Sequence, residues 1–221
     1  RAHGSGPGLP IPEEVLVTDR TRILIGRSMA GMAISFAVFG LAWLLLMGAG
    51  SLLWDDWVIH NGVVAFGSGL IAWLVVGSQP RNGEIWVFAW AGLSTGLVCL
   101  LYAIAYFMTL RYGVGTDLLE LVPAELPLPL AMVMMQVNWL WLPLLLPFSL
   151  GLLLFPDGKP PSPRWRWVAF VTVGLIVLTS FGLAWEARPS GTFPYYETQD
   201  THGGFRSLTT SMVTVGYPVS F

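Results

Sequence analysis

An apolar run that begins at Leu130 ends abruptly in the segment Leu152-Leu153-Leu154-Phe155-Pro156-Asp157-Gly158-Lys159-Pro160-Pro161-Ser162-Pro163-Arg164-Trp165-Arg166. At about 1.5 Å per residue, the run from Leu130 to Phe155 is long enough for a helix to cross a hydrocarbon core of roughly 30 Å. A Pro-Asp-Gly turn followed by three cations cannot lie in lipid, because its backbone and its charges need water. This stretch therefore predicts a membrane helix that ends at the membrane surface.

The composition extends this prediction to the whole chain. Of the 221 residues, 54% are hydrophobic and 11% are charged, whereas a soluble domain carries about 25% charged residues. We expect an all-α, multi-pass bundle whose main partner is the lipid bilayer. The net charge of −2 supplies no basic stripe for phosphates, which argues against nucleic acid as a partner.

Six apolar segments are expected to form the spans, at about residues 29–48, 62–77, 85–110, 130–155, 167–185 and 208–221. The last segment would reach only about 21 Å as a helix, so we expect it to be an incomplete span of a chain that continues past Phe221. The Gly- and Pro-rich residues 1–18 offer no apolar face and predict a flexible N-terminal arm. The transmembrane domain would then comprise residues 19–221.

The positions of the cations predict the orientation of the bundle. With the N-terminus in the cytoplasm, seven cations flank the inner ends of the spans: Arg20, Arg22, Arg27, Arg81, Lys159, Arg164 and Arg166. The outer loops then hold three, Arg111, Arg188 and Arg206. This distribution satisfies the positive-inside rule.

Acidic or basic residues at mid-depth usually mark a catalytic or transport site in a membrane protein, and the predicted spans contain no Asp, Glu, Lys, Arg or His. The sequence also lacks a Walker loop and a zinc-binding HExxH motif. We therefore expect no catalytic residue, no metal site and no cofactor in these 221 residues. Whether a longer parent chain is an enzyme stays open.

The most polar intramembrane feature is the pair Gln136 and Asn138 in the fourth predicted span. One interpretation is a patch that binds a lipid-like or amphipathic ligand. The commoner role of such side chains is a hydrogen bond between helices. Because residues two apart point to different faces of a helix, the two side chains cannot line one site together.

Two further features of the spans concern their packing and bending. Pro143 and Pro147 each remove a backbone donor, which predicts a kink near the middle of the fourth span and a candidate hinge. Gly92 and Gly96 form a GxxxG pattern, a candidate helix-packing face. The same spacing serves contacts within one chain and contacts in a homodimer, so both remain open.

Two turns that the orientation places in the cytoplasm carry a resemblance to a known family. The first is Arg81-Asn82-Gly83-Glu84-Ile85-Trp86, and the second is the stretch from Leu152 to Arg166. They resemble paired turns in the polytopic membrane input region of a family of bacterial two-component sensor histidine kinases. In that family the first turn has the form Arg-x-Asn-Pro-x-Gly-Trp, and a Leu-Phe-Pro-Asp-Gly-Arg-x-Pro-Ser-x-Arg-Trp-Arg turn follows about seventy residues later. Here Gly83 replaces the proline of the first turn.

The resemblance implies a sensor or signal-coupling role in the plasma membrane of a bacterium. It designates a coupling turn of Phe155, Pro156, Asp157, Gly158, Arg164 and Arg166, and a second turn of Arg81, Asn82 and Trp86. The family's kinase domains, which would act on a response regulator, would follow a further span and are absent from these residues. Two alternatives remain: a non-catalytic accessory subunit of a larger membrane complex, and a small-molecule carrier, which would need a polar cavity at mid-membrane.

Overall fold

The computed structural model describes residues 13–55, 57–113 and 127–186. All regular elements of these residues are helical, as the sequence predicts. They comprise α1 (Glu13–Leu46), α2 (Gly50–Asp55), α3 (Val58–Val76), α4 (Gly83–Tyr112), α5 (Leu128–Leu140), the 3₁₀ helix η2 (Leu142–Leu145), the π-helix η3 (Pro147–Gly151), α6 (Leu152–Leu154) and α7 (Trp165–Glu186).

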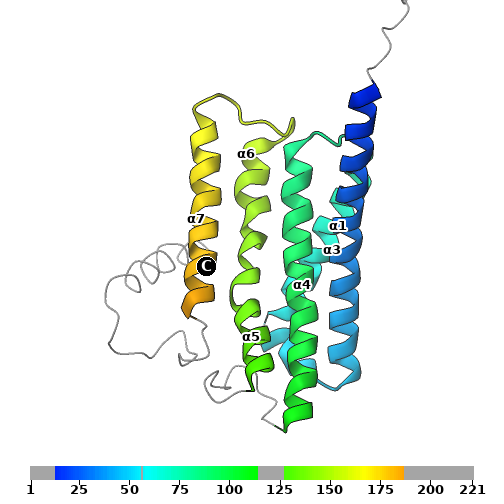
Figure 1. Ribbon diagram of the computed structural model, residues 1–221, viewed down its shortest axis with the longest axis vertical. Coiled ribbons are helices and arrows are strands. Elements are labelled where there is room, and N and C mark those ends of the chain that lie inside the picture. The colour runs from blue at the N-terminus through cyan, green and yellow to red at the C-terminus, as the bar shows by residue number, and fades with distance from the viewer. Residues whose placement is uncertain (1–12, 56, 114–126, 187–221) are drawn as a thin grey trace, which may run out of the picture.

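The long helices lie side by side in one bundle (Figure 1). Helices α1, α3 and α4 each pack against the other two, and we call them the helix trio. Residues 128–154, from α5 to α6, follow one another as a single rod beside α4, which we call the broken helix. Helix α7 packs on α5, η2 and η3 of the broken helix.

The expectation of six spans is corrected to three among the described residues. The helices long and apolar enough to cross a membrane are Thr18–Leu46, Val58–Val76 and Gly83–Tyr112. The fourth predicted span fails because its prolines divide it into short helical pieces. The apolar part of α7, Trp165–Ser180, is shorter than 18 residues. The sixth segment, 208–221, lies outside the described residues.

The boundaries also differ from the prediction near the N-terminus and in the first loop. Helix α1 begins at Glu13, within the segment expected to form the flexible arm, and residues 1–12 lie outside the described part. Residues 49–61, which separate the first two predicted spans, contain α2 and the first turn of α3.

Small residues allow the helix trio to pack closely. A Cβ atom added to Gly96 would lie 2.5 Å from the carbonyl oxygen of Ala33 in α1. A Cβ atom added to Gly92 would lie 3.0 Å from the backbone nitrogen of Gly69 in α3. Both glycines of the GxxxG pattern therefore contact helices of the same chain, the close backbone approach that small residues permit.

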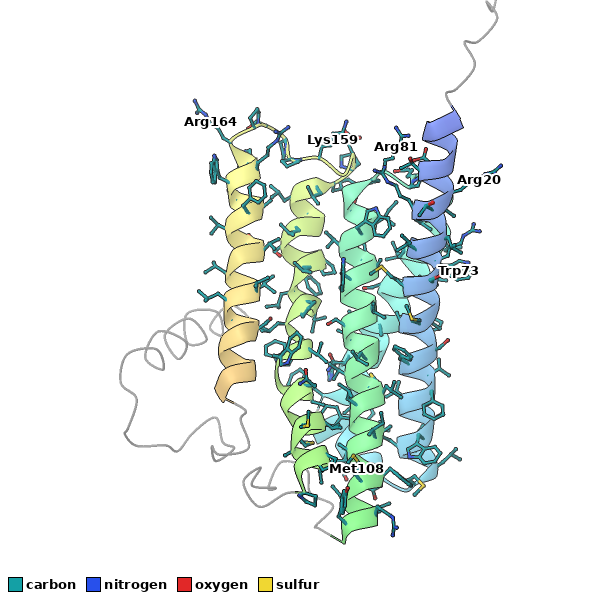
Figure 2. All side chains as sticks on the ribbon, in the orientation of Figure 1. Arg20, Trp73, Arg81, Met108, Lys159 and Arg164 are labelled. Carbon is teal, nitrogen blue, oxygen red and sulfur yellow. The ribbon has the colours of Figure 1, made fainter. Side chains whose placement is uncertain are left out.

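The cations of the described residues gather at one end of the bundle. Figure 2 shows Arg20, Arg81, Lys159 and Arg164 at the same end. Arg111 lies in the last turn of α4, which runs to the opposite end. We call the end of the bundle that holds Arg20, Arg81, Lys159 and Arg164 the cationic end. The two ends thus have the charge asymmetry from which the orientation was predicted.

Candidate functional site

The turn between α3 and α4 is held by local hydrogen bonds. Asn82 caps α4, since its Oδ1 accepts a hydrogen bond from the backbone N–H of Glu84 at 2.9 Å. Its Nδ2 donates to Oε1 of Gln79 at 2.8 Å. An N-terminal cap of this kind satisfies a backbone donor that the helix itself leaves unpaired.

The turn after α6 forms for equally local reasons. Pro156 has no N–H and restricts the preceding residue to an extended conformation, and Phe155 accordingly has φ −67° and ψ 142°. Gly158 follows with φ +67°, a conformation that glycine adopts at little cost. Its N–H donates to the carbonyl oxygen of Leu154 at 2.7 Å, which closes the turn.

These two turns contact each other at the cationic end, although their residues are more than 70 positions apart. Nδ2 of Asn82 donates to the carbonyl oxygen of Pro156 at 3.3 Å. A Cβ atom added to Gly83 would lie 2.8 Å from the carbonyl oxygen of Gly158. A Cβ atom added to Gly158 would overlap Oδ1 of Asn82 and the backbone nitrogen of Gly83. Glycine at both positions therefore allows the two backbones to meet.

Helix α1 joins the same contact through an ion pair. Nε of Arg81 donates to Oδ1 of Asp19 at 2.8 Å, and Arg22 lies 4.0 Å from the same oxygen. The hydrogen bond to Asp19 and its negative charge raise the pKa of Arg81. Both side chains are partly in solvent, so this pair adds little stability. We call the group Asp19, Arg81, Asn82, Gly83, Pro156 and Gly158 the turn junction.

The structure brings most of the predicted turn residues together. A polar recess at the junction is lined by Arg81, Asn82, Pro156 and Asp157, with Asp19 and Lys159 beside them. Trp86 reaches the same turn, because its Nε1 donates to the carbonyl oxygen of Pro80 at 3.3 Å.

Four members of the predicted coupling turn do not line this recess. One of them, Gly158, instead contacts Asn82 and Gly83. The Phe155 side chain is exposed. Arg164 and Arg166 lie at the start of α7, where their backbones form a tight turn. They are exposed, and neither forms an ion pair with a described carboxylate.

The predicted pair of amides is not assembled into a described site. Gln136 is half-buried in α5. The side chain of Asn138 lies outside the described part of the structure, so the expected polar patch remains a prediction.

The two prolines of the fourth predicted span lie where the α-helix is interrupted. Pro143 belongs to η2 and Pro147 to η3. The N–H of Leu144 donates to Trp141 at 2.9 Å instead of to Leu140, which frees the carbonyl oxygen of Leu140. Ser94 Oγ of α4 donates a hydrogen bond to that oxygen.

Sequence reasoning missed Asp19 and Ser94. Asp19 stands in the basic segment before the first span, and Ser94 lies between Gly92 and Gly96. A polar residue inside a small-residue face is a signal for a contact between helices. Its partner is a backbone carbonyl, which the sequence does not identify.

Comparison with protein-family models, with curated proteins and with solved structures found no match to this chain.

Proposed function

We propose that this chain is the membrane-embedded sensor and signal-coupling region of a bacterial two-component histidine kinase. Its setting would be the plasma membrane, and its output would reach a response regulator through domains outside these 221 residues. The proposal rests on the resemblance of the two turns to that family, and on the three apolar helices that identify a possible multi-pass membrane protein.

One observation supports this role above the others: the two turns that carry the resemblance contact each other. The bond from Asn82 to Pro156 and the apposition of Gly83 with Gly158 join the helix trio to the broken helix. A movement of the broken helix along its axis would have to shift this contact. A signal received within the membrane would in this way be converted into a change at its cytoplasmic surface.

Such coupling needs an element with two arrangements. The candidate is the interruption around Pro143 and Pro147, where 3₁₀ and π turns replace regular α-helix. Irregular turns of this kind often mark functional hinges. Replacing both prolines with leucine would restore backbone donors and favour one continuous helix.

The first experiment identifies the native polypeptide and its activity. We would purify it from its source in mild detergent, measure its intact mass, and incubate it in nanodiscs with radiolabelled ATP. The proposal expects a mass well above 24.2 kDa and transfer of phosphate to a histidine. A native chain without kinase domains that co-purifies stoichiometrically with larger subunits would instead identify an accessory subunit.

The second experiment tests the hinge in that native protein. The double variant Pro143→Leu with Pro147→Leu is expected to change the basal rate of autophosphorylation at least about fivefold, because about 1 kcal/mol of bias changes a two-state equilibrium by that factor. Pro129→Leu, in the first turn of α5, is the matched control and should leave the rate unchanged. Equal rates in both variants would contradict the hinge.

A further inference from the structure

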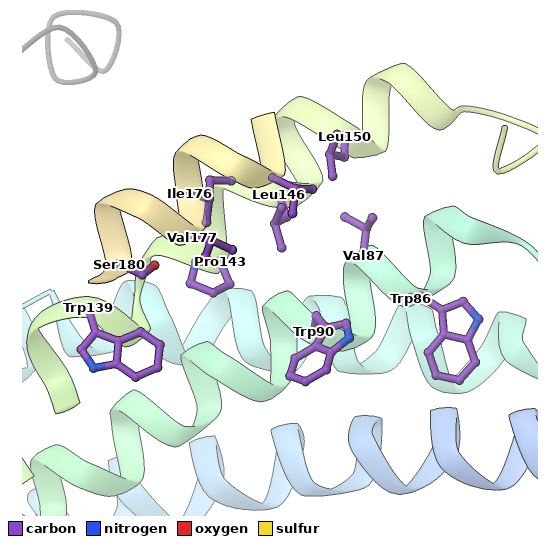
Figure 3. A pocket seen from close by; sticks show the side chains of 11 residues that line it. Trp86, Val87, Trp90, Trp139, Pro143, Leu146, Leu150, Ile176, Val177 and Ser180 are labelled. Atoms are coloured by element: carbon purple, nitrogen blue, oxygen red, sulfur yellow. The ribbon is translucent and has the colours of Figure 1, made fainter. Parts of the chain in front are cut away.

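An apolar groove lies between α4, the broken helix and α7 (Figure 3). Its volume is about 570 Å³, within the range of ligand sites in proteins, roughly 300–1,000 Å³. The side chain of Leu150 is 6% exposed, whereas that of Trp90 is 58% exposed. The groove therefore has a covered floor on the broken helix and an open aromatic wall on α4.

The groove exists because three helix faces converge without closing on one another. The broken helix contributes Pro143, Leu146 and Leu150, which lie on one face at helical spacing. Helix α7 contributes the face that contains Val173, Ile176 and Ser180. Because α7 packs on the broken helix, the broken helix forms the floor and the other two helices form the walls.

The lining selects an apolar, chain-like occupant. Its lining includes the indole rings of Trp86 and Trp90 on α4 and of Trp139 on the broken helix. Among the described residues that line the groove, Ser180 alone carries a hydroxyl group. A polar ligand would find almost no hydrogen-bonding partner in this groove. Burying its polar groups without such partners would cost free energy. The residues from Trp86 to Trp90 are on a helix that is long and apolar enough to cross a membrane, so the occupant that fits this lining is a lipid acyl chain.

The position of the groove along the bundle adds a requirement for charge. Trp86 both lines the groove and donates to Pro80 in the turn at the cationic end. Lys159, Arg164 and Arg166 flank this end of the broken helix and α7. Both described ion pairs involve Asp19, so these three cations have no carboxylate partner among the described residues. Basic groups at a membrane surface attract anionic head groups.

We propose that the groove binds one acyl chain of an anionic phospholipid of the membrane, with the phosphate held by Lys159, Arg164 and Arg166. The apolar walls bind the chain, and the cations select the head group. This site does not depend on the signalling role, because lipid binding is measured on the chain itself without any kinase activity.

The experiment measures lipid binding to the full chain after delipidation in detergent, by native mass spectrometry with phosphatidylglycerol and phosphatidylcholine as probes. We expect phosphatidylglycerol to bind at least tenfold more tightly. Val173→Trp fills the groove and should weaken the binding of both lipids about tenfold. Val171→Trp is the matched control on the same helix, since Val171 is exposed and does not line the groove. Equal binding by the two tryptophan variants would overturn the proposed chain site.

A second pair of variants tests the head-group contact without altering the groove. Arg164→Gln with Arg166→Gln should reduce the preference for phosphatidylglycerol by up to about 30-fold, since each cation near an anionic lipid contributes about 1 kcal/mol, a factor of about five. Arg20→Gln with Arg111→Gln removes the same charge elsewhere and should keep the preference. Loss of preference in both pairs, or in neither, would contradict the proposed phosphate site.

Discussion

The helix trio and the pair formed by the broken helix and α7 are packed in different ways. In α4, 56% of the residues in the most apolar window are buried inside the protein. In α7, every side chain described from 165 to 180 is at least partly exposed. Glycines let the backbones of the trio touch, whereas the later helices meet through large side chains and leave a groove. The trio is therefore the more tightly packed half, whereas the later helices leave an open groove beside α4.

The largest effect is expected when one glycine is replaced by a bulky residue in the helix trio and, separately, in α7. Gly96→Leu places a side chain against the carbonyl group of Ala33, and backbone cannot yield as a flexible side chain does. We expect the separation of α1 from α4 and loss of a folded, monodisperse protein, measured by size-exclusion chromatography in detergent and by thermal unfolding.

The matched control for that variant is Gly174→Leu in α7. A Cβ atom at Gly174 meets nothing within 4 Å, and leucine has a helix propensity better than glycine by several tenths of a kcal/mol. This variant should fold normally with an unchanged or higher Tm. Similar stability of the two leucine variants would show that the trio is no more tightly packed than α7.

The next prediction concerns the junction that joins the two halves. Gly158→Ala adds a Cβ atom against Asn82 and Gly83 at a residue with φ +67°. The backbone strain alone costs about 1–2 kcal/mol, and the overlap adds about 1–3 kcal/mol. Gly113→Ala has the same φ with open space around it, so it isolates the strain. Chemical or thermal unfolding in detergent should show a larger loss for Gly158→Ala; equal losses would mean that the contact between the turns adds no stability.

The sequence predicted the trio better than the later helices, and the reason is physical. Apolar runs such as Ile85–Leu110 have a length that lipid thickness dictates, so the helices and their approximate ends follow from composition. The prolines at 143 and 147 also indicated where the fourth run is interrupted. The sequence does not indicate that the prolines divide this run into 3₁₀ and π turns. That outcome depends on neighbouring helices, which replace the lost hydrogen bonds.

The contact between the two turns could not be derived from spacing alone. Asn82 and Gly158 are each recognisable as turn residues, because an asparagine can cap a helix and a glycine can adopt positive φ. Their mutual contact depends on how the helix trio and the broken helix align at one end, a property of packing. The groove was missed for the same reason, since its tryptophans and valines look like ordinary lipid-facing residues in the sequence.

The smallest expected effect tests the link at mid-depth between the two halves. Ser94 donates to the carbonyl oxygen of Leu140, which the interruption of the broken helix leaves without its usual N–H donor. Ser94→Ala should lower the free energy of unfolding by about 0.6 kcal/mol, the average for hydrogen bonds between membrane helices. Ser149→Ala removes a hydroxyl that bonds only within its own helix, to Leu145 and Leu146, and should cost less.

The same serine variant also tests whether Ser94 serves only the carbonyl group that the prolines free. If it does, Ser94→Ala should lower the Tm of the parent chain. In a chain with Pro143 and Pro147 replaced by leucine, it should leave the Tm unchanged. A loss of equal size in both backgrounds would mean that Ser94 stabilises the helix trio instead of its link to the broken helix.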